Sequence, residues 1–254
     1  MHTLLTVAAL VVAVAAAARS TWSPCGVSML ATVTPLAERG RGHRYRSTAA
    51  WFIAGGTAGG ATLGLFMAAL ALGVRAADPS ALALAVVACA VAVLAAASDT
   101  RLGGFHLPFH SRQVNERWLD RFRPWVYGAG FGWQIGAGLV TYIKTAALYL
   151  MLALAALTAS PSTALAIGAL FGLVRGLAVL LGRGIVSPAT LAEFHRRFTR
   201  AGAVVLGVVV GCELAVAVVF AAVLSPWAAL ALMILGATTA AGRLRRRTPA
   251  AAQS

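Results

Sequence analysis

Long apolar segments separated by short loops dominate this chain and limit what it can fold into. About 20 apolar residues in a helix span the hydrocarbon core of a membrane. Charged residues make up 11% of the sequence, against about 25% in soluble domains. The apolar segments are 3–36, 49–74, 81–97, 125–158, 163–182, 201–223 and 227–242. We therefore predict an all-α integral membrane protein with seven spans, or with six and an interfacial helix.

The loops fall into two kinds that alternate along the chain. Arginine is concentrated in 37–48, 98–124, 183–200 and the tail 243–254, whereas 75–80, 159–162 and 224–226 are short and carry almost no charge. Basic loops stay in the cytoplasm. This predicts a multi-pass protein of the cytoplasmic (inner) membrane with the N-terminus outside and the C-terminus inside. The formal net charge of +14 then reports topology, so no nucleic-acid partner is expected.

Two apolar segments are too long for a single straight span. Residues 3–36 and 125–158 would each extend about 50 Å as a helix. The first is interrupted by Ser23-Pro24-Cys25-Gly26, and the second is glycine-rich at 128–138. Each is followed by two further spans, so the halves have opposite orientation. This pattern is typical of an inverted repeat with broken helices.

We thus predict one transmembrane domain over 1–242. It holds repeat one at about 3–97, repeat two at about 125–223 and an extra helix at about 227–242, followed by the cytoplasmic tail 243–254. The alternative for residues 1–19 is a cleaved signal peptide. That alternative lacks a basic n-region, and cleavage would leave 22–36 too short to span.

The first break is a candidate site. Pro24 removes a backbone hydrogen bond and frees carbonyl groups, and Gly26 permits close approach of another backbone. Cys25 between them could be redox-active or line a substrate path. The structural alternative is a small apolar residue at a packed kink.

Ser23-Pro24-Cys25, with Pro35 further on, and Gly130-Phe131-Gly132-Trp133 resemble the motifs that open the two repeats of the CcdA/DsbD transmembrane family. That family belongs to the lysine-exporter-like superfamily and carries thiol–disulfide exchange across the membrane in cytochrome c biogenesis. The resemblance implies a redox thiol at Cys25 and a thioredoxin-like or cytochrome maturation partner. The chain departs from the family at Gln134-Ile135-Gly136, where the second cysteine is missing. Cys89 and Cys212 would pair with Cys25 only if the Cα atoms came within about 7 Å.

Three ionisable residues lie inside predicted spans of the second half, namely Lys144, Arg175 and Glu213. Such groups face the protein interior and commonly mark a functional path. A Lys144–Glu213 or Arg175–Glu213 pair would lower the cost of burial, and a purely structural ion pair is the alternative. We place the substrate path along Pro24, Gly26, Gln134, Gly136 and these three residues. Two cations against one carboxylate favour an anionic substrate or a proton-linked switch.

Other motifs point to packing and to lipid. The glycines of Ile53–Gly64 have overlapping GxxxG spacing and predict close helix packing within the monomer, with a dimer face as the alternative. Residues 111–125 place apolar side chains four apart among charges, which predicts a helix lying on anionic lipid headgroups. Pro108 separates His106 from His110, and no third ligand is evident, so neither a metal nor another cofactor is expected.

Two functions remain from the sequence. The first is a carrier that moves reducing equivalents or a small solute between the two broken helices, with Cys25 needed only for a thiol relay. The second is a non-transporting assembly factor that anchors or matures a partner enzyme. The assembly factor would tolerate loss of the intramembrane charges but not replacement of 104–124. No hydrolytic triad lies at membrane depth, so an enzyme is not expected.

Overall fold

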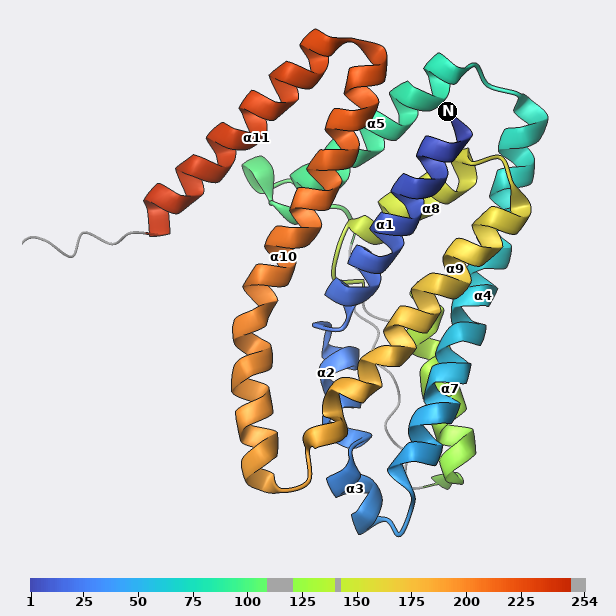
Figure 1. Cartoon of the computed structure of the whole chain (residues 1–254), viewed down its shortest axis with the longest axis vertical. Coiled ribbons are helices and arrows are strands. Elements are labelled where there is room, and N and C mark those ends of the chain that lie inside the picture. Colours follow the sequence, from blue (N-terminus) through green and yellow to red (C-terminus); the bar gives the residue numbers. More distant parts are fainter. Residues whose placement is uncertain (109–120, 140–142, 248–254) are drawn as a thin grey trace, which may run out of the picture.

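The computed structural model describes residues 1–108, 121–139 and 143–247, and these form helices without strands. Long helices lie side by side along the molecule, and the last one diverges from the bundle (Figure 1). The elements outside the two broken segments are α4 Tyr45–Ala77, α5 Ala81–Asp99, η1 Leu102–Gly104, α9 Pro161–Leu177, η2 Ala178–Gly184, α10 Pro188–Leu224 and α11 Pro226–Arg247.

The first over-long segment is divided into three helices, as its sequence predicts. They are α1 His2–Ser20, α2 Pro24–Thr32 and α3 Pro35–Gly40. Pro24 and Pro35 each stand in the first turn of a helix, where the missing N–H costs nothing. The hydroxyls of Ser23 and Thr34 cap those helices by accepting from the backbone N–H groups three residues on. Each Ser/Thr-Pro pair is therefore a helix start.

The second over-long segment is also divided, into α7 Pro124–Gly136 and α8 Ala147–Leu157. Gly138 follows α7 with φ +65°, a conformation that favours glycine. The predicted break among the glycines is thus confirmed at its C-terminal end. Neither piece is long enough to cross a membrane by itself.

Five helices of the described residues are long and apolar enough to cross a membrane: α1, α4, α5, α9 with η2, and α10. The sequence predicts seven spans, or six and an interfacial helix, and five are found among the described residues. The helix α10 begins at Pro188 rather than near residue 201. Ser187 and Thr190 form a capping box there, and charged residues 193–200 extend the helix instead of forming a loop. The predicted interfacial helix lies mostly within 109–120, outside the described residues.

Glycines join α4 to α7 and α9 at backbone contact distance. A Cβ atom added to Gly60 would lie 2.3 Å from the carbonyl oxygen of Gly168. One added to Gly136 would lie 2.0 Å from the carbonyl oxygen of Gly56. The predicted close packing within the monomer is confirmed. We call this three-helix contact the glycine seam; it comprises Gly55, Gly56, Gly59, Gly60, Gly64, Gly132, Gly136, Gly168, Gly172 and Gly176.

Most of the extensive helix contacts join the first half of the chain to the second, and the largest of them are those of α4 with α9 and α7. The helix α4 packs against α9, α5 against α10, and α1 against α8. The side chains of α1 that face the bundle are fully buried, including Leu5, Val12 and Ala16. The α1 segment is therefore part of the core.

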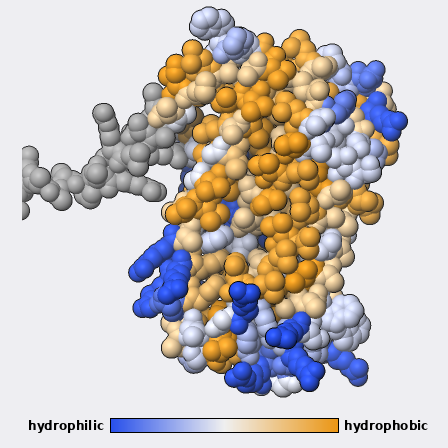
Figure 2. Space-filling model, in the orientation of Figure 1, coloured by the Kyte–Doolittle hydropathy of each residue, from blue (hydrophilic) through white to orange (hydrophobic). Residues whose placement is uncertain are grey.

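Apolar side chains cover the middle of the face shown in Figure 2, and hydrophilic ones gather at its lower end, where α3 ends and α4 and α10 begin. Large aliphatic residues lie exposed on α4 and α10, among them Leu65 at 62% and Val204 at 68%. A soluble protein would bury most of these side chains, and a membrane protein presents them to lipid.

Candidate functional site

The first break places Cys25 in the interior. The chain turns through Thr21–Ser23 between α1 and α2, and Cys25 is 3% exposed in the first turn of α2. A Cβ atom added to Gly26 would lie 2.2 Å from the carbonyl oxygen of Thr21. Gly26 is therefore needed for the close approach that the sequence predicts, which here is to the turn between α1 and α2.

Arg175 connects the two breaks. Its guanidinium is 2% exposed, and Nη1 donates a hydrogen bond of 2.5 Å to the carbonyl oxygen of Ile135 in the last turn of α7. It also lies within electrostatic reach of Cys25, and Phe171 covers it at 5.6 Å from the ring centroid. A cation at a helix C-terminus is favourable. The structure thus brings together Cys25, Arg175 and the end of α7. The sequence analysis placed Arg175 and both breaks along one predicted substrate path, without showing which residues are neighbours.

The other residues of the second break have different surroundings. Gly136 belongs to the glycine seam through its contact with Gly56, which accounts for its presence by packing. Gln134 is half-buried on α7. These placements leave Arg175 as the charged residue that bonds to the end of α7 and lies within electrostatic reach of Cys25.

A second polar group lies where α5 ends and α8 begins. Asp99 accepts a 2.7 Å hydrogen bond from the backbone N–H of Ala146 and a hydrogen bond from the hydroxyl of Thr145. A carboxylate at a helix N-terminus is favourable. Arg19 lies within electrostatic reach of Asp99, and Lys144 lies within reach of Arg19. Lys144 is half-buried beside this group.

Glu213 is fully buried in α10. Neither of its carboxyl oxygens has a hydrogen-bond partner among the described residues, although Asp99 lies within electrostatic reach. The predicted Lys144–Glu213 and Arg175–Glu213 pairs are therefore not formed by hydrogen bonds in this conformation. The buried residues one turn before and after Glu213 on the same helix are apolar, namely Val209, Val216 and Ala217.

None of the three cysteines forms a disulfide bond. Cys89 donates from Sγ to the carbonyl oxygen of Ala217, at 3.5 Å, between α5 and α10. Cys212 is half-buried on α10. The conditional disulfides of Cys25 with Cys89 or Cys212 are thus absent, and Cys89 has a packing role.

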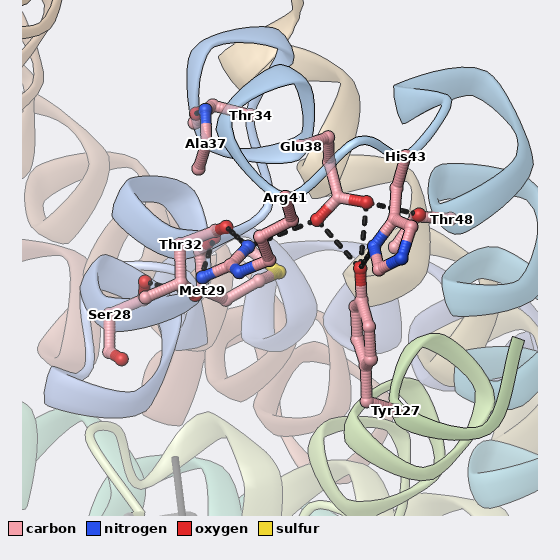
Figure 3. Close-up of polar contacts among 10 residues, drawn as sticks. All are labelled: Ser28, Met29, Thr32, Thr34, Ala37, Glu38, Arg41, His43, Thr48 and Tyr127. Atoms are coloured by element: carbon pink, nitrogen blue, oxygen red, sulfur yellow. Dashed lines mark hydrogen bonds and ion pairs between the residues drawn. The ribbon is translucent and has the colours of Figure 1, made fainter. Parts of the chain in front are cut away.

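A third polar group surrounds Glu38, which the sequence analysis did not single out. Its carboxylate is fully buried. It accepts hydrogen bonds from the hydroxyl of Thr48 at 2.5 Å, from the hydroxyl of Tyr127 at 2.7–2.8 Å and from Nη1 of Arg41 at 3.1 Å. Figure 3 shows these side chains converging on the carboxylate, with His43 beside Tyr127. We call these residues the Glu38 cluster.

The Glu38 cluster fastens helices together at the arginine-rich end of the bundle. Glu38 belongs to α3, Thr48 to α4 and Tyr127 to α7. Nδ1 of His43 lies 3.3 Å from the Tyr127 hydroxyl, and Arg41 also donates to the carbonyl oxygen of Thr32 at 2.9 Å. The sequence feature that could have indicated this cluster is Glu38 itself, the single acidic residue in the arginine-rich loop 37–48. No group of three or more metal-ligating side chains occurs among the described residues.

Curated proteins similar in sequence to this chain share one name. The chain is 30% identical over 211 residues to the methylamine utilization protein MauF of Methylorubrum extorquens, which covers 80% of this chain and 72% of that protein. The chain belongs to the MauF family. MauF of Paracoccus denitrificans is 34% identical over 175 residues, which is 66% of this chain and 60% of that protein. MauF of Paracoccus versutus is 32% identical over 166 residues, or 63% of this chain and 59% of that protein.

The chain thus spans about three fifths of the length of the two Paracoccus relatives. No family model matches it, and no solved structure matches it.

The MauF assignment corrects the resemblance to CcdA/DsbD thiol–disulfide carriers, which is wrong. The relatives that match are named MauF. The physical reason is the low specificity of Ser23-Pro24-Cys25. Serine at the N-cap and proline at the first helical position begin many helices, and Thr34-Pro35 does the same in this chain without a cysteine.

Proposed function

We propose that this chain is a non-transporting membrane assembly factor that supports an enzyme of methylamine utilization. Its membership of the MauF family carries the proposal, because those relatives are named for methylamine utilization. A carrier would need a polar path between the broken helices. The charged residue that bonds to the end of α7, Arg175, is enclosed at 2% exposure, and Gly136 is packed against Gly56, which favours the assembly factor.

The proposed setting is the cytoplasmic membrane, with the arginine-rich end of the bundle inside and the N-terminus outside. Five membrane-length helices and the apolar middle of the surface support a multi-pass protein. The concentration of arginine at one end supports the orientation. In this setting the Glu38 cluster stabilises the cytoplasmic end of the bundle.

The two halves of the chain are proposed to be inverted repeats within one domain over 1–242. The support comes from the contacts of α4 with α9, of α5 with α10 and of α1 with α8. The helices α4 and α9, and likewise α5 and α10, hold the same position in the two halves, so contacts between them are compatible with a pseudo-two-fold axis. The repeats would then provide a rigid anchor, and the loop 104–124 would meet the partner at the cytoplasmic surface.

Growth on methylamine tests this proposal. In a methylotroph that lacks its own mauF gene, this chain is expected to restore growth on methylamine. Replacing 104–124 by a Gly/Ser-rich segment of equal length is expected to abolish rescue. Lys144→Met and Glu213→Gln are expected to retain it, because an assembly factor moves no substrate past these side chains. Growth on succinate and immunodetection of the chain in membranes are the controls.

Each result separates the two functions. Loss of rescue by Lys144→Met or Glu213→Gln, with normal amounts of the protein in the membrane, would favour the carrier. Full rescue by the 104–124 replacement would contradict the assembly factor. Thiol trapping of Cys25 provides a further check, since an assembly factor needs no oxidised form of this residue and Cys25→Ser is expected to rescue growth.

A further inference from the structure

The guanidinium of Arg175 uses only part of its hydrogen-bonding capacity. Nη1 donates to the carbonyl oxygen of Ile135. Nε and Nη2 are buried without a hydrogen-bond partner among the described residues. Buried donors are nearly always paired, and an exception calls for an explanation such as a ligand.

The two free nitrogens lie on one edge of the group. The Nε–H and one Nη2–H bond of a guanidinium are parallel, and this edge matches the two oxygens of a carboxylate. Phe171 covers a face of the planar group at 5.6 Å from its ring centroid, and Ile135 occupies Nη1. The edge without a hydrogen-bond partner among the described residues is therefore the one suited to a two-point contact.

The surroundings leave the positive charge uncompensated. Among the described residues no carboxylate forms an ion pair with Arg175. The C-terminus of α7 contributes only about half a negative charge through the Ile135 carbonyl. A charge buried in apolar surroundings is stable only when it is paired.

We propose that the Nε–Nη2 edge of Arg175 is a carboxylate-binding site inside the membrane domain. The carboxylate can come from a bound molecule or from Glu213 of this chain after a shift of the helices. Glu213 is the matching candidate, because both of its oxygens are buried without partners. The proposal rests on the geometry of Arg175 and stands independently of the assembly function.

Acetate tests the site in the purified full-length chain. The apparent unfolding midpoint is measured in detergent at one scan rate, in sodium acetate and in sodium chloride of equal ionic strength. Where a bound molecule supplies the carboxylate, acetate at about ten times its dissociation constant is expected to raise the midpoint of the wild type by roughly 3–6 °C relative to chloride. Lys144→Met is expected to keep the shift, and Arg175→Lys, which keeps the charge but loses the planar edge, is expected to lose it.

Glu213→Gln separates the two sources. If a bound molecule supplies the carboxylate, acetate raises the midpoints of wild type and Glu213→Gln alike. If Glu213 supplies it, the wild type shows no shift. Glu213→Gln then gains a shift, because the Nε–Nη2 edge of Arg175 no longer binds the Glu213 carboxylate. In that case Arg175→Met and Glu213→Gln are also non-additive in the double variant.

The proposal is overturned if acetate raises neither midpoint relative to chloride. It is equally overturned if a shift seen in the wild type persists in Arg175→Lys, or if a shift seen in Glu213→Gln persists in the double variant Arg175→Lys/Glu213→Gln. Should neither Arg175 variant fold, the comparison of acetate with chloride in wild type and Glu213→Gln still decides the matter.

Discussion

Glu38 and Arg175 are both buried charged residues, yet their surroundings differ. Donors from three residues surround the Glu38 carboxylate, and Arg41 provides a countercharge at 3.1 Å. Arg175 makes one hydrogen bond to a backbone carbonyl and leaves two nitrogens without a partner. The hydrogen bonds and the countercharge offset the cost of burying Glu38, so its arrangement is explained as a structural contact. The second has a cost that the described residues do not offset, which is why it points to binding.

The two residues also differ in what holds them in place. Glu38 is held by its own hydrogen bonds, at the end of the bundle. Arg175 bonds to Ile135 of α7 and stands next to Gly176, a member of the glycine seam. Substitutions can therefore disturb each site separately.

Glu38→Ala is expected to have the largest effect on stability. It leaves Arg41, Thr48 and Tyr127 without their shared acceptor, and breaking such a buried charged contact costs about 3–5 kcal/mol. Unfolding of the chain by SDS in mixed micelles measures the loss. Glu193→Ala is the control, because its contacts with Arg196 and Arg197 are exposed and worth little. Equal stability of the two variants would show that the Glu38 cluster is not structural.

Tyr127→Phe is expected to have the next largest effect. It removes one donor to the carboxylate while keeping the ring, and a hydrogen bond to a charged group contributes about 1.5–3 kcal/mol. The same SDS unfolding measures it. In the background of Glu38→Ala the substitution is expected to cost much less. Equal costs in both backgrounds would mean that Tyr127 acts through packing alone.

Gly60→Ala tests the glycine seam that positions Arg175. The new methyl group would meet the Gly168 carbonyl oxygen at 2.3 Å and the Cα atom of Gly172 at 2.6 Å. Overpacking of this kind costs about 1–3 kcal/mol. Gly73→Ala, on the same helix with nothing within 4 Å, is the matched control. It is expected to be neutral or stabilising by up to about 1 kcal/mol, and equal destabilisation by both variants would contradict the seam.

The sequence predicts the helical breaks well, because proline, serine and glycine act on their own neighbours. Ser23-Pro24 and the glycines near 136 mark breaks that the structure contains. The glycine seam was also predictable, since GxxxG spacing is a local pattern. The start of α10 at Pro188 was missed because charges at 193–200 suggested a loop, whereas Ser187 and Thr190 cap a helix there.

The polar groups were less predictable, because each depends on distant segments. Arg175 was identified by its depth in a span, but its bond to Ile135 crosses 40 residues of sequence. Glu38 reaches Tyr127 across 89 residues, and within an arginine-rich loop it gave no sign of burial. In the sequence, Asp99 is only the residue just after an apolar segment. Its hydrogen bond with Ala146 forms because the second break places the start of α8 there.

Arg175→Met is the most direct test of the contrast between the two buried charges. The substitution keeps an apolar stem and removes a charge that lacks a buried partner, so we expect the free energy of unfolding to change by no more than about 1 kcal/mol. Measured beside Glu38→Ala in the same SDS titration, Arg175→Met is predicted to be as stable as the wild type while Glu38→Ala unfolds much earlier. If Arg175→Met is destabilised as strongly as Glu38→Ala, Arg175 is a structural residue and the contrast between the two sites is wrong.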